Sequence, residues 1–385
     1  MSYSSRALLT VIATCALLPG AARQLHGQQT VTVPVGDRIL SGAAPQVFAV
    51  GRADGASWEM FSRIAGLEFD AQGNLYVLDA GNHRVVVFDR NGRFQREFGR
   101  RGEGPGEFRR PSSITITSAG EVVVNDVGNR AVVIFGPNGE FRRQVSLAEI
   151  VDPPYRVYPG PDGRIVALSQ GREHPEGRFA RVYILPARTG AAHVEIARQP
   201  LPAALEPRMR NNELAGIRFR RTPVYSPEAY MAAMSNGTAI LQTDTDYALK
   251  ILDHTGRHVR TLKRALPAMP VTDEIREAFK RNWARVRVES GASAELPYDP
   301  SFAEFMSQVT GLRADRSGRV WVRRRAPDGD ESGPIDIVTV AGVYAGTVRN
   351  LPLPAAFGPD AMMAFVSTDE LGVERVVVRR HPTAW

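Results

Sequence analysis

The feature that most constrains the fold is an internal repeat in the first half of the chain. Five residues recur at a constant offset of 47 positions: Gly73, Asp79, Asn82, Phe88 and Gly92 return as Gly120, Asp126, Asn129, Phe135 and Gly139. A period of about 40 to 50 residues is typical of β-propellers, in which each repeat forms one blade. The sequence therefore predicts an array of similar units rather than several unrelated domains.

Each unit contains four short runs with the alternation of β-strands. In the first unit these runs are residues 64–70, 75–78, 84–88 and 94–98, and turns separate them. The Asn91-Gly92 pair is a strong hairpin signal, because both residue types adopt positive φ readily. A four-stranded sheet with two apolar faces cannot bury them alone, whereas blades packed around an axis can.

Residues 74–88, with the sequence Asn-Leu-Tyr-Val-Leu-Asp-Ala-Gly-Asn-His-Arg-Val-Val-Val-Phe, resemble an NHL repeat. That family is named after the Asn-His-Leu triplet of its consensus, and Arg84 stands here in place of the leucine. Residues 98–111 resemble the loop between two NHL repeats. The resemblance is specific in the first two units and implies a six-bladed β-propeller.

Hairpin signals locate the remaining units. Turns at residues 161–163 and 189–190 bracket a third unit, those at 236–237 and 255–256 a fourth, and those at 316–318 and 341–342 a fifth. Residues 361–367 and 374–380 are predicted strands of a sixth unit that lacks its fourth strand. Residues 47–51 precede Ile64 as residues 97–99 precede Ile114, so we expect them to supply that strand and close the ring.

The predicted fold is therefore all-β: a six-bladed β-propeller of four-stranded antiparallel blades, closed by an N-terminal strand, over residues 28–385. Two segments interrupt the pattern. Residues 203–226 are predicted to form a long surface loop. Residues 270–308 are predicted to form an insertion with a helix over residues 273–286, capped by Thr272 or Asp273. Residues 230–234 have helical propensity, but the repeat register favours an inner strand.

The N-terminus has the pattern of a secretory signal peptide over residues 1–27. A short positive start is followed by an apolar run at residues 7–18 and by small residues, with cleavage after Ala22 or Gly27. The apolar run is too short to span a bilayer, so no stable membrane insertion is expected. Cys15 is the only cysteine, and the mature chain is predicted to be periplasmic or secreted without a disulfide.

The charge pattern argues against a nucleic-acid partner. The formal net charge is +7, but the 48 lysines and arginines are scattered along the chain. Proteins that bind nucleic acids usually gather basic residues in a patch or stripe.

Polar residues gather in the loops between second and third strands and between blades, which share one face of a propeller. We call it the loop face. Its candidate ligand-binding residues are Asp79, Asn82, His83, Arg84, Arg100, Arg101, Arg109, Asp126, Asn129 and Arg130. One interpretation is an arginine-rich rim for an anionic ligand or partner. The alternative is a structural role in turns, because Asp79, Asn82 and Arg84 recur as Asp126, Asn129 and Arg130.

No catalytic residue is assigned from the sequence. The resemblance to six-bladed propellers suggests metal-dependent lactonases and lyases, which need carboxylate, Asn or His side chains converging on the axis. Glu68 is the one weak candidate for a metal ligand, on an inner strand and opposite in direction to Leu67 and Phe69. Calcium or zinc would be the cofactor only in that case, and no cofactor is expected otherwise.

The sequence thus favours an exported binding or scaffold propeller for a protein, peptide or carbohydrate. The alternative is a metal-dependent hydrolase or lyase with its site at the axis. An axis lined by arginine or apolar side chains would favour binding, and three or more converging carboxylate, Asn or His side chains would favour the enzyme.

Overall fold

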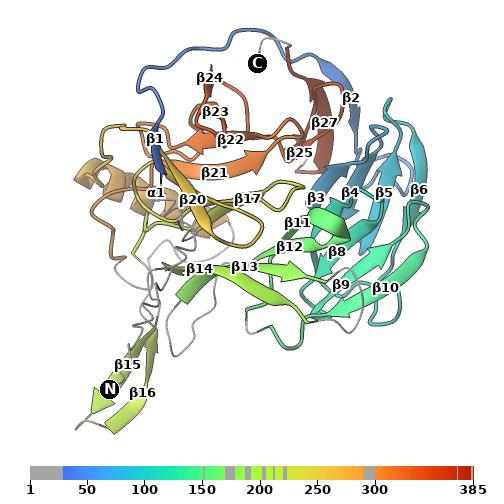
Figure 1. Cartoon of the computed structure of the whole chain (residues 1–385), viewed down its shortest axis with the longest axis horizontal. Helices are drawn as coiled ribbons and strands as arrows, with labels where there is room; N and C mark the ends of the chain where they lie inside the picture. The colour runs from blue at the N-terminus through green and yellow to red at the C-terminus, as the bar shows by residue number, and fades with distance from the viewer. Residues whose placement is uncertain are drawn as a thin grey trace, which may run out of the picture.

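The protein folds into six antiparallel sheets arranged around a common axis (Figure 1). The structure is a computed structural model, and it describes residues 29–150, 152–169, 178–186, 192–201, 205–210, 213–219, 223–289, 300–370, 372–382 and 385. The six-bladed propeller with four-stranded antiparallel blades is therefore confirmed. The predicted signal peptide at residues 1–27 lies outside the described residues.

The first three blades follow the chain from the innermost strand outwards. Their strands are β3 (Ile64–Phe69), β4 (Leu75–Asp79), β5 (Arg84–Phe88) and β6 (Phe94–Phe98) in blade 1; β7 (Pro111–Ile116), β8 (Val122–Asp126), β9 (Ala131–Phe135) and β10 (Phe141–Ser146) in blade 2; and β11 (Arg156–Pro159), β12 (Ile165–Ser169), β13 (Arg178–Leu185) and β14 (Val194–Leu201) in blade 3. A single 3-10 turn, Pro161–Gly163, joins β11 to β12.

The other three blades complete the ring. Their strands are β17 (Tyr230–Ala233), β18 (Ala239–Gln242), β19 (Ala248–Leu252) and β20 (His258–Lys263) in blade 4; β21 (Val309–Ala314), β22 (Arg319–Arg324), β23 (Ile335–Thr339) and β24 (Tyr344–Val348) in blade 5; and β25 (Ala356–Phe357), β26 (Met362–Thr368) and β27 (Glu374–Arg380) in blade 6. The repeat register correctly predicted β17 as an inner strand.

The core lies between the blades rather than within any one of them. The middle strands β4 and β9 are buried along their whole length, because each side chain faces one neighbouring blade or the other. Buried apolar residues form a separate cluster at each blade interface. Valine-rich middle strands are what this arrangement requires, since branched side chains fill two-sided sheets well.

The ring closes as the sequence predicts. Strand β2 (Gln46–Val50) pairs antiparallel with β27 and becomes the outer strand of blade 6. The strand order β2-β27-β26-β25 therefore joins the two ends of the described chain in one sheet. Closure of this kind leaves no blade face exposed at the seam.

The segment before β2 has a second role that the sequence did not indicate. Strand β1 (Gln29–Thr32) pairs parallel with β20 at the outer edge of blade 4, and Ile39 forms a parallel bridge with Thr347 of β24. Residues 29–50, which we call the N-terminal strap, thus cover the outer edges of three consecutive blades. Paired edges cannot recruit strands of other molecules.

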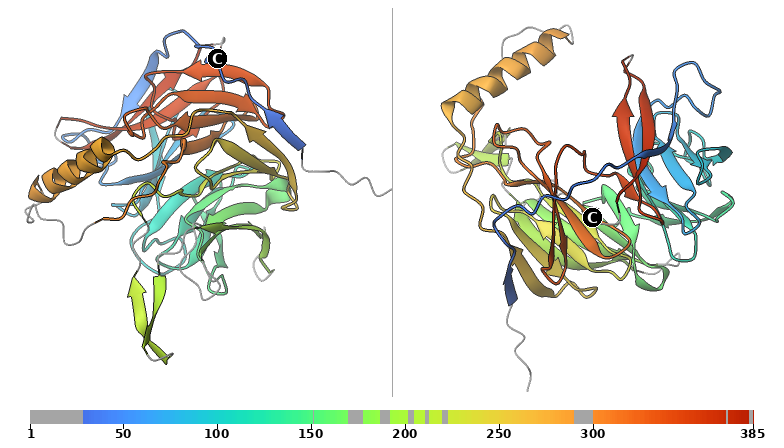
Figure 2. Two further views of the ribbon diagram at one scale, coloured as in Figure 1. Left: turned by 90° about the vertical axis from the view of Figure 1, so that its left-hand side faces the viewer. Right: turned by 90° about the horizontal axis from the view of Figure 1, so that it is seen from above.

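Both predicted interruptions leave the ring, but only one has the expected structure. Helix α1 (Asp273–Glu289) lies in the predicted insertion and stands away from the blades (Figure 2). Thr272 Oγ1 accepts a hydrogen bond from the Ile275 amide at 3.4 Å, which caps the helix as expected. The prediction of a long loop at residues 203–226 was wrong. That segment forms an antiparallel hairpin of β15 (Leu205–Arg210) and β16 (Glu213–Phe219) that extends from the ring.

The alternation of β15 and β16 is short, and Pro207 interrupts it, which is why the pattern was not visible in the sequence. Across the described ranges, no helix is long and apolar enough to cross a membrane.

Candidate functional site

The repeated aspartates of the loop face attach interblade loops to the blades. Asp79 is fully buried, and its Oδ1 accepts hydrogen bonds from the amides of Ser62 and Arg63 at 3.1 and 3.4 Å. Its Oδ2 accepts from Asn82 Nδ2 at 2.7 Å and from Arg84 Nε at 3.1 Å. Both oxygens are occupied, so Asp79 acts here as a structural clip.

Asp126 makes the same clip in blade 2. Its Oδ2 accepts from the Arg109 amide at 2.7 Å, and its Oδ1 accepts from the amides of Arg110 and Gly128 at 2.8 and 3.0 Å. The incoming loop passes so close that a Cβ at Gly128 would lie 2.7 Å from the Arg110 nitrogen. The Asp-x-Gly-Asn motif thus has the same role in blades 1 and 2, where the aspartate holds the loop that enters the blade.

One of the predicted correspondences was wrong. Arg130 occupies the position of His83 and not that of Arg84, because both His83 and Arg130 have positive φ, 58° and 48°, just before a third strand. Arg84 Nη2 donates to the carbonyls of Ser57 and Met60, and Arg130 Nη2 donates to those of Leu147, Ala148 and Ile150. The two arginines hold interblade loops from different positions.

The remaining rim residues are more exposed but partly paired. Arg100 forms an ion pair with Glu107 at 2.7 Å, and Arg109 forms one with Glu103 at 2.9 Å. Asn129 Nδ2 donates to the carbonyl of Gly102, whereas Arg101 is exposed. A ligand-binding role for these rim residues stays a prediction, and the clip residues contribute to it only by shaping the loops.

The two insertions meet above blades 4 and 5 on the loop face. Val224, which follows the β15–β16 segment, forms a parallel bridge with Phe302, which follows α1. The ring of Tyr225 lies 6.3 Å from that of Phe302, measured between centroids, and the ring of Phe279 in α1 lies 5.6 Å from Phe302. Trp283, also in α1, lies 5.9 Å from Phe279. These four aromatic side chains, which we call the aromatic platform, join the two insertions.

A small cavity of about 140 Å³ opens at the base of the insertion that contains α1. Its walls come from the second–third loop of blade 4 and from both ends of the helical insertion: Thr245, Asp246, Ala268, Met269, Phe305, Met306 and Gln308. Phe305 is 37% exposed, which is unusual for a phenylalanine. The cavity is mainly apolar with polar groups at one side.

The inner strands place two arginines at the axis that the sequence analysis did not single out. Arg156 is the first residue of β11, and Arg313 lies in β21. Their neighbours Val157 and Leu312 pack into interblade clusters. Because successive side chains of a strand point to opposite faces, the two arginines lie on the opposite faces of β11 and β21. Burial, together with the nearby Arg156 guanidinium, lowers the pKa of Arg313 to about 10.

A third arginine reaches the same region from the second strand of blade 5. Arg323 pairs with Gly311 in the β21–β22 ladder, and a Cβ at Gly311 would lie 3.5 Å from Arg323 Nε. Its Nε and Nη2 donate to the hydroxyl and carbonyl oxygens of Thr310 at 3.0 and 2.9 Å. We call Arg156, Arg313 and Arg323 the axial arginine cluster.

The inner strand of blade 6 is short. Strand β25 contains two residues, whereas β3, β7 and β21 contain six. Arg316 of blade 5 accordingly reaches past blade 6 and donates to the carbonyls of Phe69 and Asp70 in blade 1 at 3.1 and 3.2 Å. In the sequence, the only sign of Arg156 and Arg313 is that each is a charged residue in a predicted inner strand, next to an apolar residue of the core.

Glu68 lies near the axis, opposite in direction to the buried Leu67 and Phe69 as predicted. Burial raises the pKa of Glu68 to about 7, against the opposing effects of the Phe69 amide and the Arg316 guanidinium. Thr115 of blade 2 lies beside it. Neither a guanidinium nor a backbone amide is a metal ligand. Among the described residues, no three His, Cys, Asp or Glu side chains lie together in a group that could hold a metal ion.

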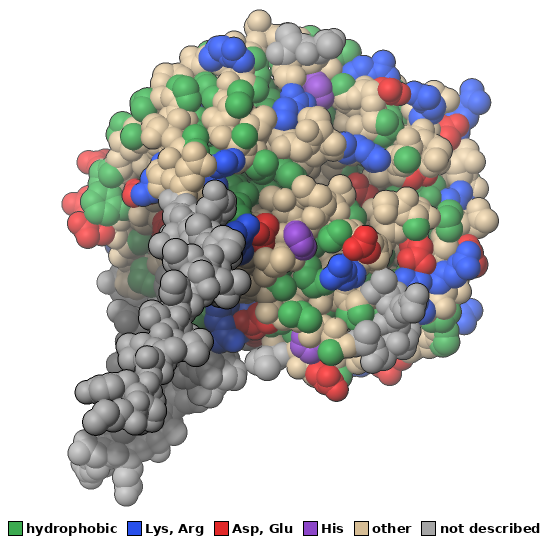
Figure 3. Space-filling view, viewed as in Figure 1, with side chains coloured by type: hydrophobic (Ala, Val, Ile, Leu, Met, Phe, Trp, Pro, Cys, Tyr) green, Lys and Arg blue, Asp and Glu red, His purple; other side chains and the backbone are tan. Residues whose placement is uncertain are grey.

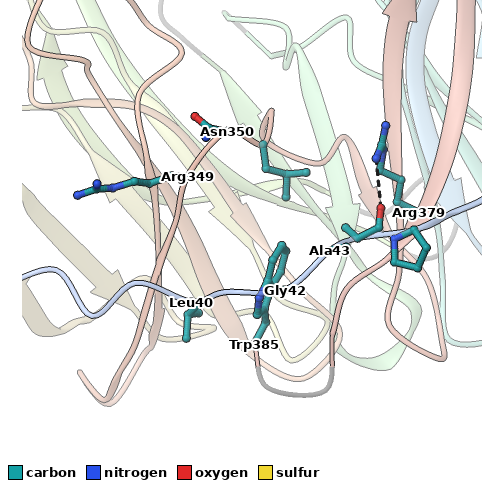
Figure 4. Close-up of a pocket in the computed structure, with 10 residues that line it drawn as sticks. Leu40, Gly42, Ala43, Arg349, Asn350, Arg379 and Trp385 are labelled. Atoms are coloured by element: carbon teal, nitrogen blue, oxygen red, sulfur yellow. Dashed lines mark hydrogen bonds between the residues drawn. The ribbon is translucent and has the colours of Figure 1, made fainter.

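A larger cavity of about 390 Å³ lies away from the axis, between the strap and blades 5 and 6 (Figure 4). Leu40, Gly42 and Ala43 of the strap line it together with Arg349, Asn350, Arg379 and Trp385. Arg379 Nη1 donates to the carbonyl of Ala44 at 3.2 Å, which holds the strap at the cavity edge.

The surface agrees with the scattered charge of the sequence. Figure 3 shows basic side chains dispersed among acidic and apolar ones on the face in view, rather than gathered in a single patch. The absence of a nucleic-acid partner stays a prediction.

Comparisons with known proteins support the architecture. The family model described as "DUF5128: 6-bladed beta-propeller" matches residues 60–177. "Protein brain tumor" of Drosophila melanogaster is 32% identical over 56 residues, which span 14% of this chain and 5% of that protein. The fold is thus a six-bladed β-propeller, and the likeness to an NHL protein is confined to a short segment.

Two solved structures resemble this chain at low sequence identity. A protein of Bacteroides fragilis NCTC 9343 described as "Putative exported protein" superimposes with a TM-score of 0.50 and 10% identity, over 92% of this chain and 100% of that one. A streptogramin B lyase superimposes with a TM-score of 0.44 and 12% identity, over 86% and 97%. At these identities the likeness concerns the fold alone.

Proposed function

We propose that this protein is an exported binding propeller that receives a protein, peptide or carbohydrate ligand on its loop face. The observation that carries the proposal is the meeting of both insertions on that face. The aromatic platform joins them, and the cavity beside Phe305 opens at the base of the helical insertion. Aromatic side chains on a rigid scaffold supply large contact areas at low entropic cost and dominate many binding sites.

Two further observations support the proposal. The signal-peptide pattern of residues 1–27 supports export, as does the shared fold with the Bacteroides fragilis protein described as exported. Arginines gather at the axis, which is the arrangement that favours binding over metal-dependent hydrolysis or lysis. The rim residues His83, in blade 1, and Arg101, between blades 1 and 2, lie on the same face but across the ring from the insertions, where they would offer a separate contact.

The test compares ligand binding by the wild type and by Trp283→Ala on peptide and oligosaccharide arrays. We expect the wild type to bind a defined set of ligands and Trp283→Ala to bind them at least about tenfold more weakly. Phe141→Ala is the matched control, because Phe141 is an exposed aromatic residue next to a third–fourth turn, on the opposite face. Equal binding by Trp283→Ala and Phe141→Ala would contradict the proposal.

A further inference from the structure

The axial arginine cluster gathers three positive charges, and Asp330 opposes that of Arg323 only from beyond ion-pair distance. Arg156, Arg313 and Arg323 come from two blades, and both Arg156 and Arg323 act on Arg313 as like charges. None of the three forms an ion pair with a carboxylate in the part of the chain that the structure describes. Elsewhere in blade 5, by contrast, Arg319 and Arg324 both have aspartate partners.

Arg313 is also incompletely hydrogen-bonded. Its Nη1 donates to the carbonyl of Leu312 at 2.8 Å, but its buried Nε has no hydrogen-bond partner among the described groups. A buried polar donor without a partner is costly, and a guanidinium stays protonated at neutral pH. Such a group is retained at little benefit to stability, which points to a partner from outside the chain.

We propose that the axial arginine cluster binds a compact oxyanion, a carboxylate or phosphate group, of the ligand that the loop face receives. The inference rests on the proposed function and adds the chemistry of one recognised group. Guanidinium groups pair with carboxylates and phosphates through parallel N–H donors, and such pairs gain strength where water is excluded.

The surroundings of the cluster fit this role. Thr310 holds two donors of Arg323 in place, so the guanidinium is oriented before any ligand arrives. Tyr155 and Tyr158 flank Arg156, and the Tyr158 hydroxyl donates to the Met231 carbonyl at 3.1 Å.

The experiment titrates the mature protein with citrate, glucuronate and inorganic phosphate in separate calorimetric runs at constant ionic strength. We expect one equivalent of at least one anion to bind, and Arg313→Met and Arg156→Met to weaken it about tenfold or more. Arg90→Met is the matched control, because Arg90 lies in an exposed third–fourth turn on the opposite face. Preference for glucuronate would indicate a carboxylated sugar, and preference for phosphate a phosphorylated group.

Arg313→Lys serves as a second variant if Arg313→Met does not fold, since it keeps the charge and loses the planar pair of donors. No saturable binding of any of the three anions would overturn the inference, as would equal affinities in the axial variants and in Arg90→Met. Retained array binding without anion binding overturns this inference alone. Anion binding with unaltered array binding by Trp283→Ala overturns the proposed function alone.

Discussion

Blades 1 and 2 are fastened by contacts that repeat in the sequence, whereas blades 4 to 6 are fastened by one long segment. In blades 1 and 2, Asp79 and Asp126 each hold the interblade loop that enters their own blade. In blades 4 to 6, residues 29–50 run along three outer edges and tie them together. Local motifs therefore recur and can be recognised, while the strap occurs once.

The strap is held at its centre by a buried ion network. Arg264, at the end of blade 4, forms ion pairs with Asp37 of the strap at 2.9 Å and with Asp336 of blade 5 at 2.6 Å. Arg264 Nε and Nη2 also donate to the carbonyls of Pro34, Val35 and Gly36. Arg264 and Asp336 side chains are fully buried, so one side chain joins two blades and the strap.

The largest effect is expected from removing the strap. Deleting residues 28–52 takes away β1 and β2, which exposes the edges of blades 4 and 6 and opens the ring. We expect loss of soluble, folded protein, because an open ring exposes apolar blade faces as well as strand edges. Soluble yield and circular dichroism measure this, and a cooperatively melting truncated protein would contradict the role given to the strap.

The next effect tests the ion network alone. Arg264→Met keeps much of the side-chain volume but leaves Asp336 buried without its closest ion-pair partner, which is expected to cost about 3–5 kcal/mol of unfolding free energy. Arg257→Met in the same blade removes an exposed ion pair with Asp253 and should cost less than about 1 kcal/mol. Urea unfolding of both variants decides whether the network or the overall charge matters.

Much of the fold, but little of the site, could be predicted from the sequence. A fixed offset of 47 residues located blades 1 and 2, and hairpin turns at less regular intervals located most of the later blades, including strand β17. The likeness of residues 47–51 to residues 97–99 located the closing strand β2. The strap has no period, and its partners lie more than two hundred positions away in the chain. Such a pairing leaves no local pattern to detect.

The axial arginines escaped prediction for a related reason. Arg156 and Arg313 lie in different blades and meet only because all inner strands surround one axis. Arg323 reaches the same region from the second strand of blade 5, where Thr310 accepts two of its hydrogen bonds. By contrast, the recurrence of Asp79 as Asp126 is visible in the sequence, and both carboxylates accept backbone amides of the loop that enters their own blade.

Removing one aspartate clip is expected to lower stability less than the two changes to the strap and its ion network. Asp126→Ala deprives four backbone amides of their acceptor and should lower the unfolding free energy by about 2–3 kcal/mol. Glu103→Ala removes one exposed carboxylate of the same loop and should change stability by less than about 0.5 kcal/mol. If Asp126→Ala costs more than Arg264→Met under the same conditions, the contrast between local clips and strap is reversed.

The smallest effect concerns Glu68, where blade 1 meets Arg316 of blade 5. Burial raises the pKa of Glu68 in the folded state to about 7, above its value in the unfolded chain. As pH rises from about 5 to 8, the unfolded chain loses this proton first, so the folded state loses stability relative to it. Glu68→Gln should match the wild type near pH 5 and exceed it by up to roughly 2 kcal/mol at pH 8.

Urea unfolding of the wild type, Glu68→Gln and the exposed control Glu103→Gln at four pH values checks this expectation. A difference that stays constant with pH would contradict the expectation, because it would show that folding does not raise the pKa of Glu68 into this range. The same samples test the metal-dependent alternative. If calcium or zinc raises the melting temperature of the wild type but not of Glu68→Gln, the axis holds a metal at Glu68, and the oxyanion would bind beside that metal rather than to the arginines alone.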